Sequence, residues 1–236
     1  MSIAVDAPRR RAPSSPSSGR LRNRAADATR ARIIAAAVRH IGRYGPEGAS
    51  LRSLLAEAGA SASAASYHFG SKSGLYRAVA DSYYERIRSR LEALMEAAVA
   101  LPAGPERLRA LVEAHIRPHL ELVVGEGEHD YGLMALQFAA DGQSSEWRGA
   151  EQVVRDLRER FRAALGDCCP GVDEARLGRG IGLVVAVMAR APFNTPSFSL
   201  TSRVIGDVPI DTLIEEAVSF ASAGLSGLLG VSGNAR

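Results

Sequence analysis

Apolar residues recur at intervals of three and four along most of the chain, which is the spacing of one face of an α-helix. No stretch of useful length alternates polar and apolar residues as a β-strand does, and no internal repeat is visible. The pattern therefore predicts an all-α protein. The expected helices cover residues 29–44, 50–58, 61–69, 71–100, 105–124, 131–140, 145–165, 173–191 and 210–229.

Residues 50–76 carry the most informative local pattern, two short helices joined by a glycine turn. Ser50 and Ser61 are suited to cap these helices, because a serine hydroxyl can accept a hydrogen bond from a free amide of the first turn. Gly59 suits the left-handed position that ends a helix. A helix-turn-helix that enters the major groove of DNA has this form. The side chains expected to face outward are Ser63, Tyr67, His68 and, beyond a second glycine, Lys72.

The chemistry of these side chains suggests how each could meet DNA. The Arg52 guanidinium can bind O6 and N7 of a guanine together, whereas Ala64 offers only a methyl contact to thymine. Lys72 is expected at a helix N-terminus, where a cation is unfavourable unless a phosphate also binds there. The alternative for Lys72 is a solvated surface lysine. We expect phosphate contacts and DNA shape to contribute more than direct base contacts. The predicted DNA-binding residues are Ser50, Arg52, Ser61, Ser63, Ala64, Tyr67, His68 and Lys72.

The stretch from Thr29 to Tyr76 resembles the TetR family of bacterial repressors, and it covers about a fifth of the chain. The resemblance implies a homodimer with an N-terminal DNA-binding domain and a C-terminal effector domain. Ser63 and Ala64 match family positions that meet base edges, and Tyr67, His68 and Lys72 match positions that meet the DNA backbone. The matching elements are Gly45, Ser50-Leu-Arg, Ala58-Gly59-Ala60-Ser61, Tyr67-His68-Phe69-Gly70-Ser71-Lys72 and Gly74-Leu75-Tyr76. Ala60 and Ser66 depart from residues common in the family.

Charge is distributed unevenly along the chain. Residues 1–77 hold 13 Arg and Lys against 4 Asp and Glu, a net charge of +9, while residues 78–236 have a net charge of −6. A basic end on an acidic body suits a DNA-binding head. Residues 1–27, rich in Arg, Pro and Ser, are predicted to be a disordered basic arm, either lying along DNA or serving as a solubilising tail. The predicted domains are then 28–76, which binds DNA, and 77–230, which binds ligand and dimerises.

The resemblance implies an effector pocket among the helices that follow residue 100. His115 and His119 have the i,i+4 spacing of metal ligands, but Pro118 lies between them and no Cys or His partner is near, so no metal or other cofactor is predicted. A mainly apolar lining suggests an apolar or amphipathic small molecule. The candidate lining residues are His115, His119, Tyr131, Met134, Gln137, Phe138, Trp147 and Phe161.

The last two predicted helices are candidates for the dimer interface, because their small and apolar residues allow close packing around a two-fold axis. The alternative is that the same residues form the core of their own chain. A dimer suits an operator with two half-sites about one DNA turn apart. The candidate residues are Ile181, Val185, Met188, Ile214, Ala217, Phe220, Ala221, Gly224 and Leu228.

Several classes of protein are disfavoured. The longest apolar run, Ile181–Ala189, is too short to cross a bilayer, and no secretory signal is visible, so we expect a cytoplasmic protein that does not enter a membrane. Cys168 and Cys169 are adjacent, either as a thiol sensor or as small residues before a turn. No phosphate-binding loop, dinucleotide turn, GxSxG or HExxH occurs. The prediction is a repressor of an operator on double-stranded DNA; an architectural DNA-binding protein and an enzyme are the alternatives.

Overall fold

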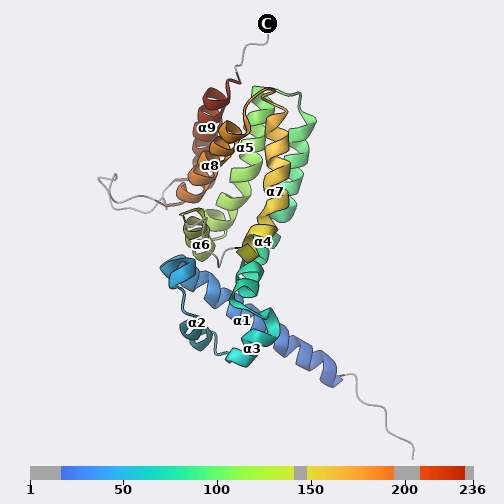
Figure 1. Ribbon diagram of the computed structural model, residues 1–236, viewed down its shortest axis with the longest axis vertical. Helices are drawn as coiled ribbons and strands as arrows, with labels where there is room; N and C mark the ends of the chain where they lie inside the picture. Colours follow the sequence, from blue (N-terminus) through green and yellow to red (C-terminus); the bar gives the residue numbers. More distant parts are fainter. Residues whose placement is uncertain (1–16, 141–147, 194–207, 232–236) are drawn as a thin grey trace, which may run out of the picture.

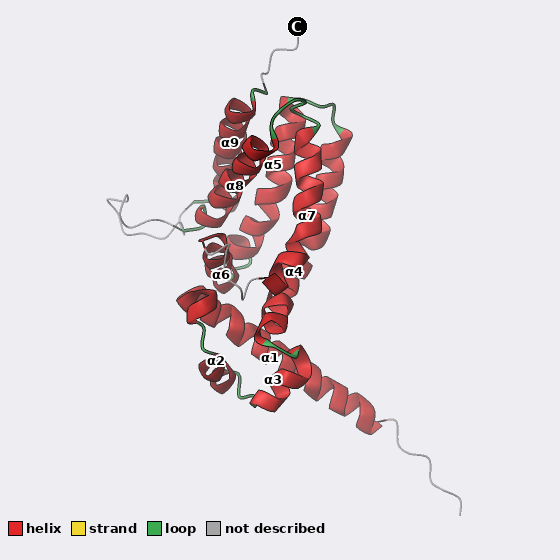
Figure 2. Ribbon diagram, viewed as in Figure 1, coloured by secondary structure: helices red, strands yellow, loops and turns green. Residues whose placement is uncertain are grey.

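The computed structural model describes residues 17–140, 148–193 and 208–231, and the regular secondary structure in these ranges is helical (Figures 1 and 2). The all-α prediction is confirmed. The helices are α1 (Ser17–Gly48), α2 (Leu51–Glu57), α3 (Ala62–Phe69), α4 (Lys72–Ala100), α5 (Pro105–Leu120), a π-helical turn η1 (Glu121–Gly125), α6 (His129–Ala140), α7 (Arg148–Gly166), α8 (Glu174–Arg190) and α9 (Ile210–Leu229). None of the helices in the described ranges is long and apolar enough to cross a membrane.

The molecule has a small head and a longer helical body. The head consists of α1, α2, α3 and the first turns of α4, while the rest of α4 forms the body with α5, α7, α8 and α9 (Figure 1). Helix α6 lies at the end of the body next to the head and packs on α1. Helix α4 therefore belongs to both parts, and α6 forms a second connection between them.

The core of the head follows the predicted apolar faces. Ile33 and Ile41 of α1, Leu54 of α2 and Ala65 of α3 are buried against the start of α4. The hydroxyl of Tyr76 donates a hydrogen bond to the Pro46 carbonyl oxygen, which ties α4 to the end of α1. This packing leaves one face of α3 free to contact a partner.

The N-caps of α2 and α3 form as the serine positions predict, and Ser71 caps α4 in the same way. The Oγ atoms of Ser50, Ser61 and Ser71 each accept a hydrogen bond from the amide three residues on, at 3.4, 3.2 and 3.0 Å. Gly59 and Gly70 adopt φ angles of 58° and 72°, in the left-handed region that glycine enters without a steric penalty. Local sequence chemistry thus determines where these three helices begin and where the two short ones end.

Helix α1 begins at Ser17, so the predicted disorder of residues 17–27 is wrong. The Arg, Leu and Ala residues that follow Gly19 have high helix propensity and extend the helix even though they bury little surface, as Leu21 shows with 65% exposure. The regular helix is interrupted at Gly45, which has φ 74° and ψ 170°, where a loop was predicted. The remaining part of the predicted arm, residues 1–16, lies outside the described residues.

Helix α5 runs through the middle of the body and contacts α4, α7, α8 and α9. Leu108, Leu111 and Ile116 are fully buried on it. Pro118 occupies its last turn, where proline cannot donate its backbone hydrogen bond, and the chain continues directly into η1. Most side chains of α5 are therefore buried or half-buried, and two of these are histidines.

Candidate DNA-binding surface and effector cavity

The exposed face of α3 presents polar side chains on a helix of small residues. Ser61 and Ser63 are exposed, with their Oγ atoms 2.9 Å apart, and Tyr67 is 82% exposed. Ala65 faces the core, and Ala64 is half-buried beside the exposed face. Because alanine adds little bulk, the α3 backbone can approach the floor of a groove closely.

The C-terminal end of α3 and the start of α4 form one edge of this surface. The ring of His68 lies 5.1 Å from that of Tyr67, and both precede the turn at Gly70. The Lys72 Nζ lies 5.4 Å from the centroid of the Tyr76 ring, in the first turn of α4. The lysine is thus placed where helix amides and an ammonium can meet the same phosphate.

Helix α2 completes the surface. Ser50 and Arg52 are exposed at its start. All of the predicted DNA-binding residues are therefore exposed or half-buried on the head, and none lies in the interior. This placement is what contact with DNA requires.

Residues that hold α2 in place were not found from the sequence. The Glu57 carboxylate binds Arg39 Nε at 2.6 Å and His40 Nε2 at 2.8 Å, both from α1. The hydrogen bond from Arg39 is the main reason that the pKa of Glu57 lies below its usual range. Arg32 Nε also donates to the Ala58 carbonyl oxygen at 3.1 Å. No sequence motif marks these contacts, because they join residues 17 to 26 positions apart.

The body contains a partly open space of about 70 Å³ between α4, α6, α7 and α8, which we call the inner cavity. Its lining is mostly apolar, with two tyrosines and one arginine. The lining residues are Ala80, Tyr83, Tyr84, Met134, Ala135, Phe138, Arg158, Val185, Met188 and Ala189. Of the predicted effector-binding residues, Met134 and Phe138 line this cavity.

Five other predicted effector-binding residues are described, and they do not line the inner cavity. His119 is fully buried and hydrogen-bonds through Nδ1 to the Tyr83 hydroxyl. Tyr131 shares a hydrogen bond of 3.1 Å with Ser82, and the Arg86 guanidinium lies 5.0 Å above its ring. His119 Nδ1 and the Tyr131 hydroxyl thus have partners within the chain, which sequence spacing could not reveal, whereas His119 Nε2 is buried without a hydrogen-bond partner in the described part of the chain.

The remaining three contribute to packing at other places. His115 stacks on Phe161 with ring centroids 4.7 Å apart, and Phe161 is fully buried. Gln137 Nε2 donates to the Gly42 carbonyl oxygen of α1 at 3.3 Å, so it joins the head to the body. Trp147 lies outside the described residues.

Burial keeps both core histidines neutral. Desolvation lowers the pKa of His115 to about 4, with a smaller contribution from Arg158, and lowers the pKa of His119 to about 3. Within the described residues no group of three His, Cys, Asp or Glu side chains is arranged to hold a metal ion. Instead of binding a metal, His115 packs against Phe161, and His119 forms a hydrogen bond with Tyr83.

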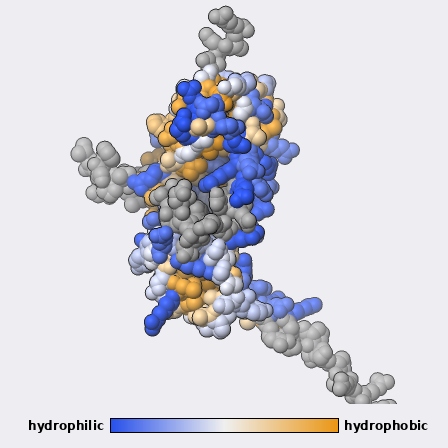
Figure 3. All heavy atoms as spheres, viewed as in Figure 1, coloured by the Kyte–Doolittle hydropathy of each residue, from blue (hydrophilic) through white to orange (hydrophobic). Residues whose placement is uncertain are grey.

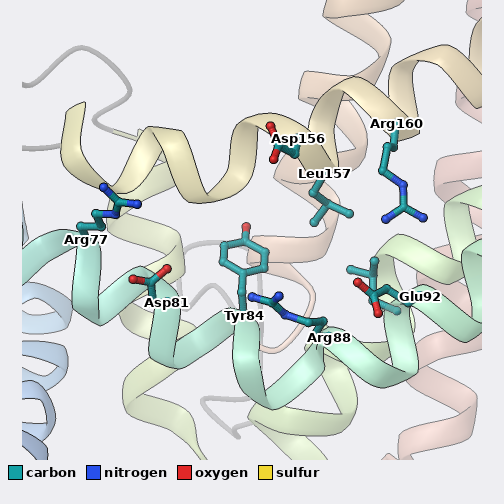
Figure 4. Close-up of a pocket in the computed structure, with 9 residues that line it drawn as sticks. Arg77, Asp81, Tyr84, Arg88, Glu92, Asp156, Leu157 and Arg160 are labelled. Atoms are coloured by element: carbon teal, nitrogen blue, oxygen red, sulfur yellow. The ribbon is translucent and has the colours of Figure 1, made fainter.

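A second, open hollow of about 370 Å³ lies between α4 and α7, and we call it the outer groove (Figure 4). Charged side chains of both signs line it, and the Tyr84 ring projects from α4 toward α7 within it. Tyr84 lines the inner cavity as well, so the two spaces meet at this residue. The lining residues of the outer groove are Arg77, Asp81, Tyr84, Arg88, Leu91, Glu92, Asp156, Leu157 and Arg160.

The two adjacent cysteines are buried free thiols, and their Sγ atoms donate to the carbonyl oxygens of Ala164 and Leu165. Burial raises the pKa of the Cys169 thiol. A buried thiol with a raised pKa forms little thiolate, so Cys169 favours packing over redox sensing, and Cys168 is buried beside it.

Part of the predicted dimer interface is buried within its own chain. Ile214, Ala217 and Ala221 are at most 7% exposed in the α9 core, so they cannot also face a partner. Hydrophobic residues nevertheless appear along the α8 and α9 side of the surface (Figure 3). Phe220 is 73% exposed, and Leu183, which the sequence did not single out, is 62% exposed.

The other interface candidates differ in exposure. Gly224 is exposed beside Phe220, whereas Ile181, Val185, Met188 and Leu228 are half-buried. Val185 and Met188 line the inner cavity, so they face the interior of the body. Fewer of the candidate residues on α8 and α9 therefore face outward than the apolar periodicity predicts.

The fold and the surface of α3 define a helix-turn-helix DNA-binding protein with a helical regulatory domain. Two family models support this: "Bacterial regulatory proteins, tetR family" matches residues 33–79, and "Tetracyclin repressor-like, C-terminal domain" matches residues 113–224. The chain belongs to the TetR family of bacterial transcriptional regulators, which are not enzymes, and the resemblance predicted from residues 29–76 is confirmed. It is a transcriptional regulator whose C-terminal domain binds ligand.

Individual relatives agree with the family assignment. The chain is 32% identical over 159 residues to the HTH-type transcriptional regulator BetI of Agrobacterium fabrum, covering 65% of this chain and 71% of that one. It is 28% identical over 153 residues to the HTH-type transcriptional repressor SCO4008 of Streptomyces coelicolor, covering 62% and 72%. The transcriptional regulator FadR from Bacillus subtilis, solved in complex with stearoyl-CoA, matches with a TM-score of 0.50 at 13% identity over 85% and 98% of the two chains, a likeness of fold alone.

Proposed function

We propose that this protein is a cytoplasmic repressor that binds a two-fold symmetric DNA operator as a homodimer and leaves it when a small apolar or amphipathic molecule enters the inner cavity. One observation carries the proposal. Helix α4 begins with Lys72 at the DNA-binding surface, and Ala80, Tyr83 and Tyr84 of the same helix line the cavity. A ligand that shifts α4 therefore shifts the start of the helix that faces DNA.

Helix α6 provides a second mechanical connection. Met134, Ala135 and Phe138 line the cavity, and neighbouring residues of the same helix pack on α1. At Gly42 of α1 the two helices approach so closely that an added Cβ would lie 3.0 Å from Leu133 Cβ. Movement of α6 on ligand binding is thus transmitted to the head, and DNA affinity falls by the difference in ligand affinity between the two head positions.

The proposed contacts with DNA are divided by type. Arg52 supplies a base contact in each half-site, while Tyr67, His68 and Lys72 contact phosphates. Ser61 and Ser63 add short polar side chains that can contact either a base edge or a phosphate. Few direct base hydrogen bonds are available on α3, so DNA shape contributes much of the sequence preference.

The test begins by selecting preferred operators from random duplexes with the purified chain, and then compares Arg52→Ala with Lys72→Ala. Arg52→Ala should relax preference at one base pair per half-site, losing roughly 1–3 kcal/mol of discrimination. Lys72→Ala should weaken binding to every sequence alike and reduce the slope of log affinity against log salt by about 1 for each phosphate that the lysine no longer neutralises. Fluorescence anisotropy measures both.

The matched control is Arg155→Ala, which removes an exposed arginine from the body and should leave DNA binding unchanged. If Arg52→Ala and Lys72→Ala lower affinity equally for the selected operator and for random DNA, the assigned division between base and phosphate contacts is wrong. If no operator can be selected, the protein is an architectural binder and the repressor proposal fails.

A further inference from the structure

The inner cavity has one charged group in its lining, the guanidinium of Arg158. Arg158 forms no ion pair with any residue in the described part of the chain, whereas Arg86, Arg117 and Arg162 of the same body each bind a carboxylate. Arg158 is exposed at the edge of the cavity, so water solvates it in the free protein. A cation beside an apolar space is therefore free to bind an anionic group.

Tyr84 adds a hydrogen-bond donor next to this cation. Its ring makes an edge contact with the Tyr83 ring, but within the described residues its hydroxyl has no hydrogen-bond partner. Figure 4 shows the hydroxyl directed toward α7, the helix that carries Arg158. Burial raises the pKa of Tyr84 to about 12, with Arg158 acting in the opposite direction, so the hydroxyl keeps its proton at neutral pH.

The groups around the cavity do not neutralise this positive charge. No Asp or Glu occurs among the residues that line it. His115, which is close enough for Arg158 to lower its pKa further, is neutral at physiological pH. One positive charge and one hydroxyl donor thus stand at the edge of an apolar space.

We propose that the effector is a small amphipathic carboxylate whose apolar end occupies the inner cavity and whose carboxylate binds Arg158 and the Tyr84 hydroxyl. This rests on the proposed function, since it specifies the ligand of the same cavity. A guanidinium binds a carboxylate through charge-assisted hydrogen bonds, which are stronger than neutral ones. A protonated amine would be repelled at this position, and an alcohol could accept a hydrogen bond from the guanidinium but brings no negative charge to attract it.

The size of the cavity limits the apolar end. A cavity of about 150 Å³ holds a benzene molecule, so the space of about 70 Å³ suits a short alkyl group. Met134 and Met188 line it, and flexible methionine side chains can move to accommodate a somewhat longer chain. Short to medium straight-chain carboxylates are therefore the appropriate probes.

The outer groove does not offer the same selectivity. Its lining combines Arg77, Arg88 and Arg160 with three carboxylates, so an anion there meets as many negative as positive charges. Arg160 is also on α7, two residues beyond Arg158, and it lines the outer groove without lining the cavity. It is therefore a matched control for the same loss of charge.

The experiment uses the full chain and measures binding of carboxylates from propionate to octanoate by titration calorimetry, beside alcohols and amines of equal length. We expect the carboxylates to bind about tenfold more tightly than the alcohols, because only a carboxylate adds the attraction of an opposite charge to the hydrogen bond from the guanidinium. Arg158→Gln should abolish this advantage, and Tyr84→Phe should reduce it. Arg160→Gln should leave it intact.

Three results would overturn the inference: alcohols that bind as tightly as carboxylates, a reduction in Arg160→Gln equal to that in Arg158→Gln, or no carboxylate binding by a protein that still binds its operator. Operator affinity is measured in parallel by fluorescence anisotropy. If carboxylates bind through Arg158 but leave operator affinity unchanged, the ligand class is supported and the proposed release mechanism fails.

Discussion

The turn between α3 and α4 depends on the absence of one side chain. A Cβ added at Gly74 would lie 2.0 Å from the Phe69 carbonyl oxygen, a contact that backbone atoms cannot relieve without moving. The same turn holds Tyr67, His68 and Lys72 in their relative positions. The geometry of the proposed DNA-binding surface is thus determined partly by a glycine that has no side chain of its own.

Gly74→Ala should therefore destabilise the fold by about 1–3 kcal/mol, as overpacking against rigid neighbours does. Gly178→Ala is the control, because an added Cβ at this exposed position in α8 meets nothing within 4 Å. It should stabilise the protein by roughly 0.5–1 kcal/mol through helix propensity. Urea denaturation measures both variants, and equal stability in the two would show that the turn relaxes without cost.

The buried histidines make stability depend on pH. The pKa values of His115 and His119 are lowered by burial to about 4 and about 3, from an ordinary value of 6.5. Below pH 6.5 the unfolded chain binds protons that the folded chain does not. Each histidine should therefore reduce the free energy of unfolding, by at most about 1.4 kcal/mol per pH unit, as pH falls from about 6.5 toward its folded pKa.

His119→Gln should flatten the dependence of stability on pH in this range, since the variant has no imidazole to protonate. His129→Gln provides the comparison, because it makes the same substitution at an exposed position, at the start of α6. Urea midpoints from about pH 7.5 down to about pH 4.5 give the slopes, since this window spans the ordinary histidine pKa. Parallel curves for wild type and His119→Gln would contradict the assignment.

At the scale of elements, the sequence predicts the helix bounds that are set by interactions between residues close together in the chain. Serine caps and left-handed glycines determined the bounds of α2, α3 and α4, and the apolar period determined α9 over residues 210–229. The start of α1 was missed because Pro, Ser and Arg content suggested disorder, while helix propensity prevailed from Ser17 onward. Distant contacts could not be predicted, since nothing local indicates that His119 faces Tyr83, 36 positions earlier.

The contact between α1 and α6 should control communication between cavity and head. Gly42→Ala would place a Cβ 3.0 Å from Leu133 Cβ and 3.3 Å from the Met134 amide nitrogen, so α6 must move away from α1 by a few tenths of an ångström. We expect weaker operator binding in the absence of any ligand. The free energy that couples the inner cavity to the head should change by about 0.5–2 kcal/mol.

Anisotropy titrations of the selected operator measure this change, with Gly178→Ala again as the control for a glycine replaced within a helix. Urea denaturation at the same temperature establishes that Gly42→Ala remains folded during the titration. A folded Gly42→Ala variant with wild-type operator affinity would exclude the α1–α6 contact as a route between the two parts.

At the scale of the whole molecule, the charge distribution agrees with the fold. The net charge of +9 lies in residues 1–77, which contain α1, α2, α3 and the first residues of α4, and the remainder is acidic. Exposed Arg20, Arg24 and Arg30 extend the basic surface along α1. An acidic body opposes non-specific attachment of the far end to DNA, so association is oriented toward the head.

Pairing of two heads requires an interface in the body, and α8 and α9 provide the most exposed apolar residues there. Phe220→Glu and Leu183→Glu should convert the proposed dimer to a monomer, because each places a carboxylate in the proposed apolar contact. Val99→Glu is the control, since Val99 is also exposed, at 45%, but lies near the end of α4.

A monomer binds one half-site only, so affinity for the full operator should fall sharply while contacts within a half-site persist. Sedimentation velocity reports the mass and anisotropy the affinity. A Phe220→Glu protein that remains dimeric, or a Val99→Glu protein that dissociates equally, would require the two-fold axis to lie elsewhere.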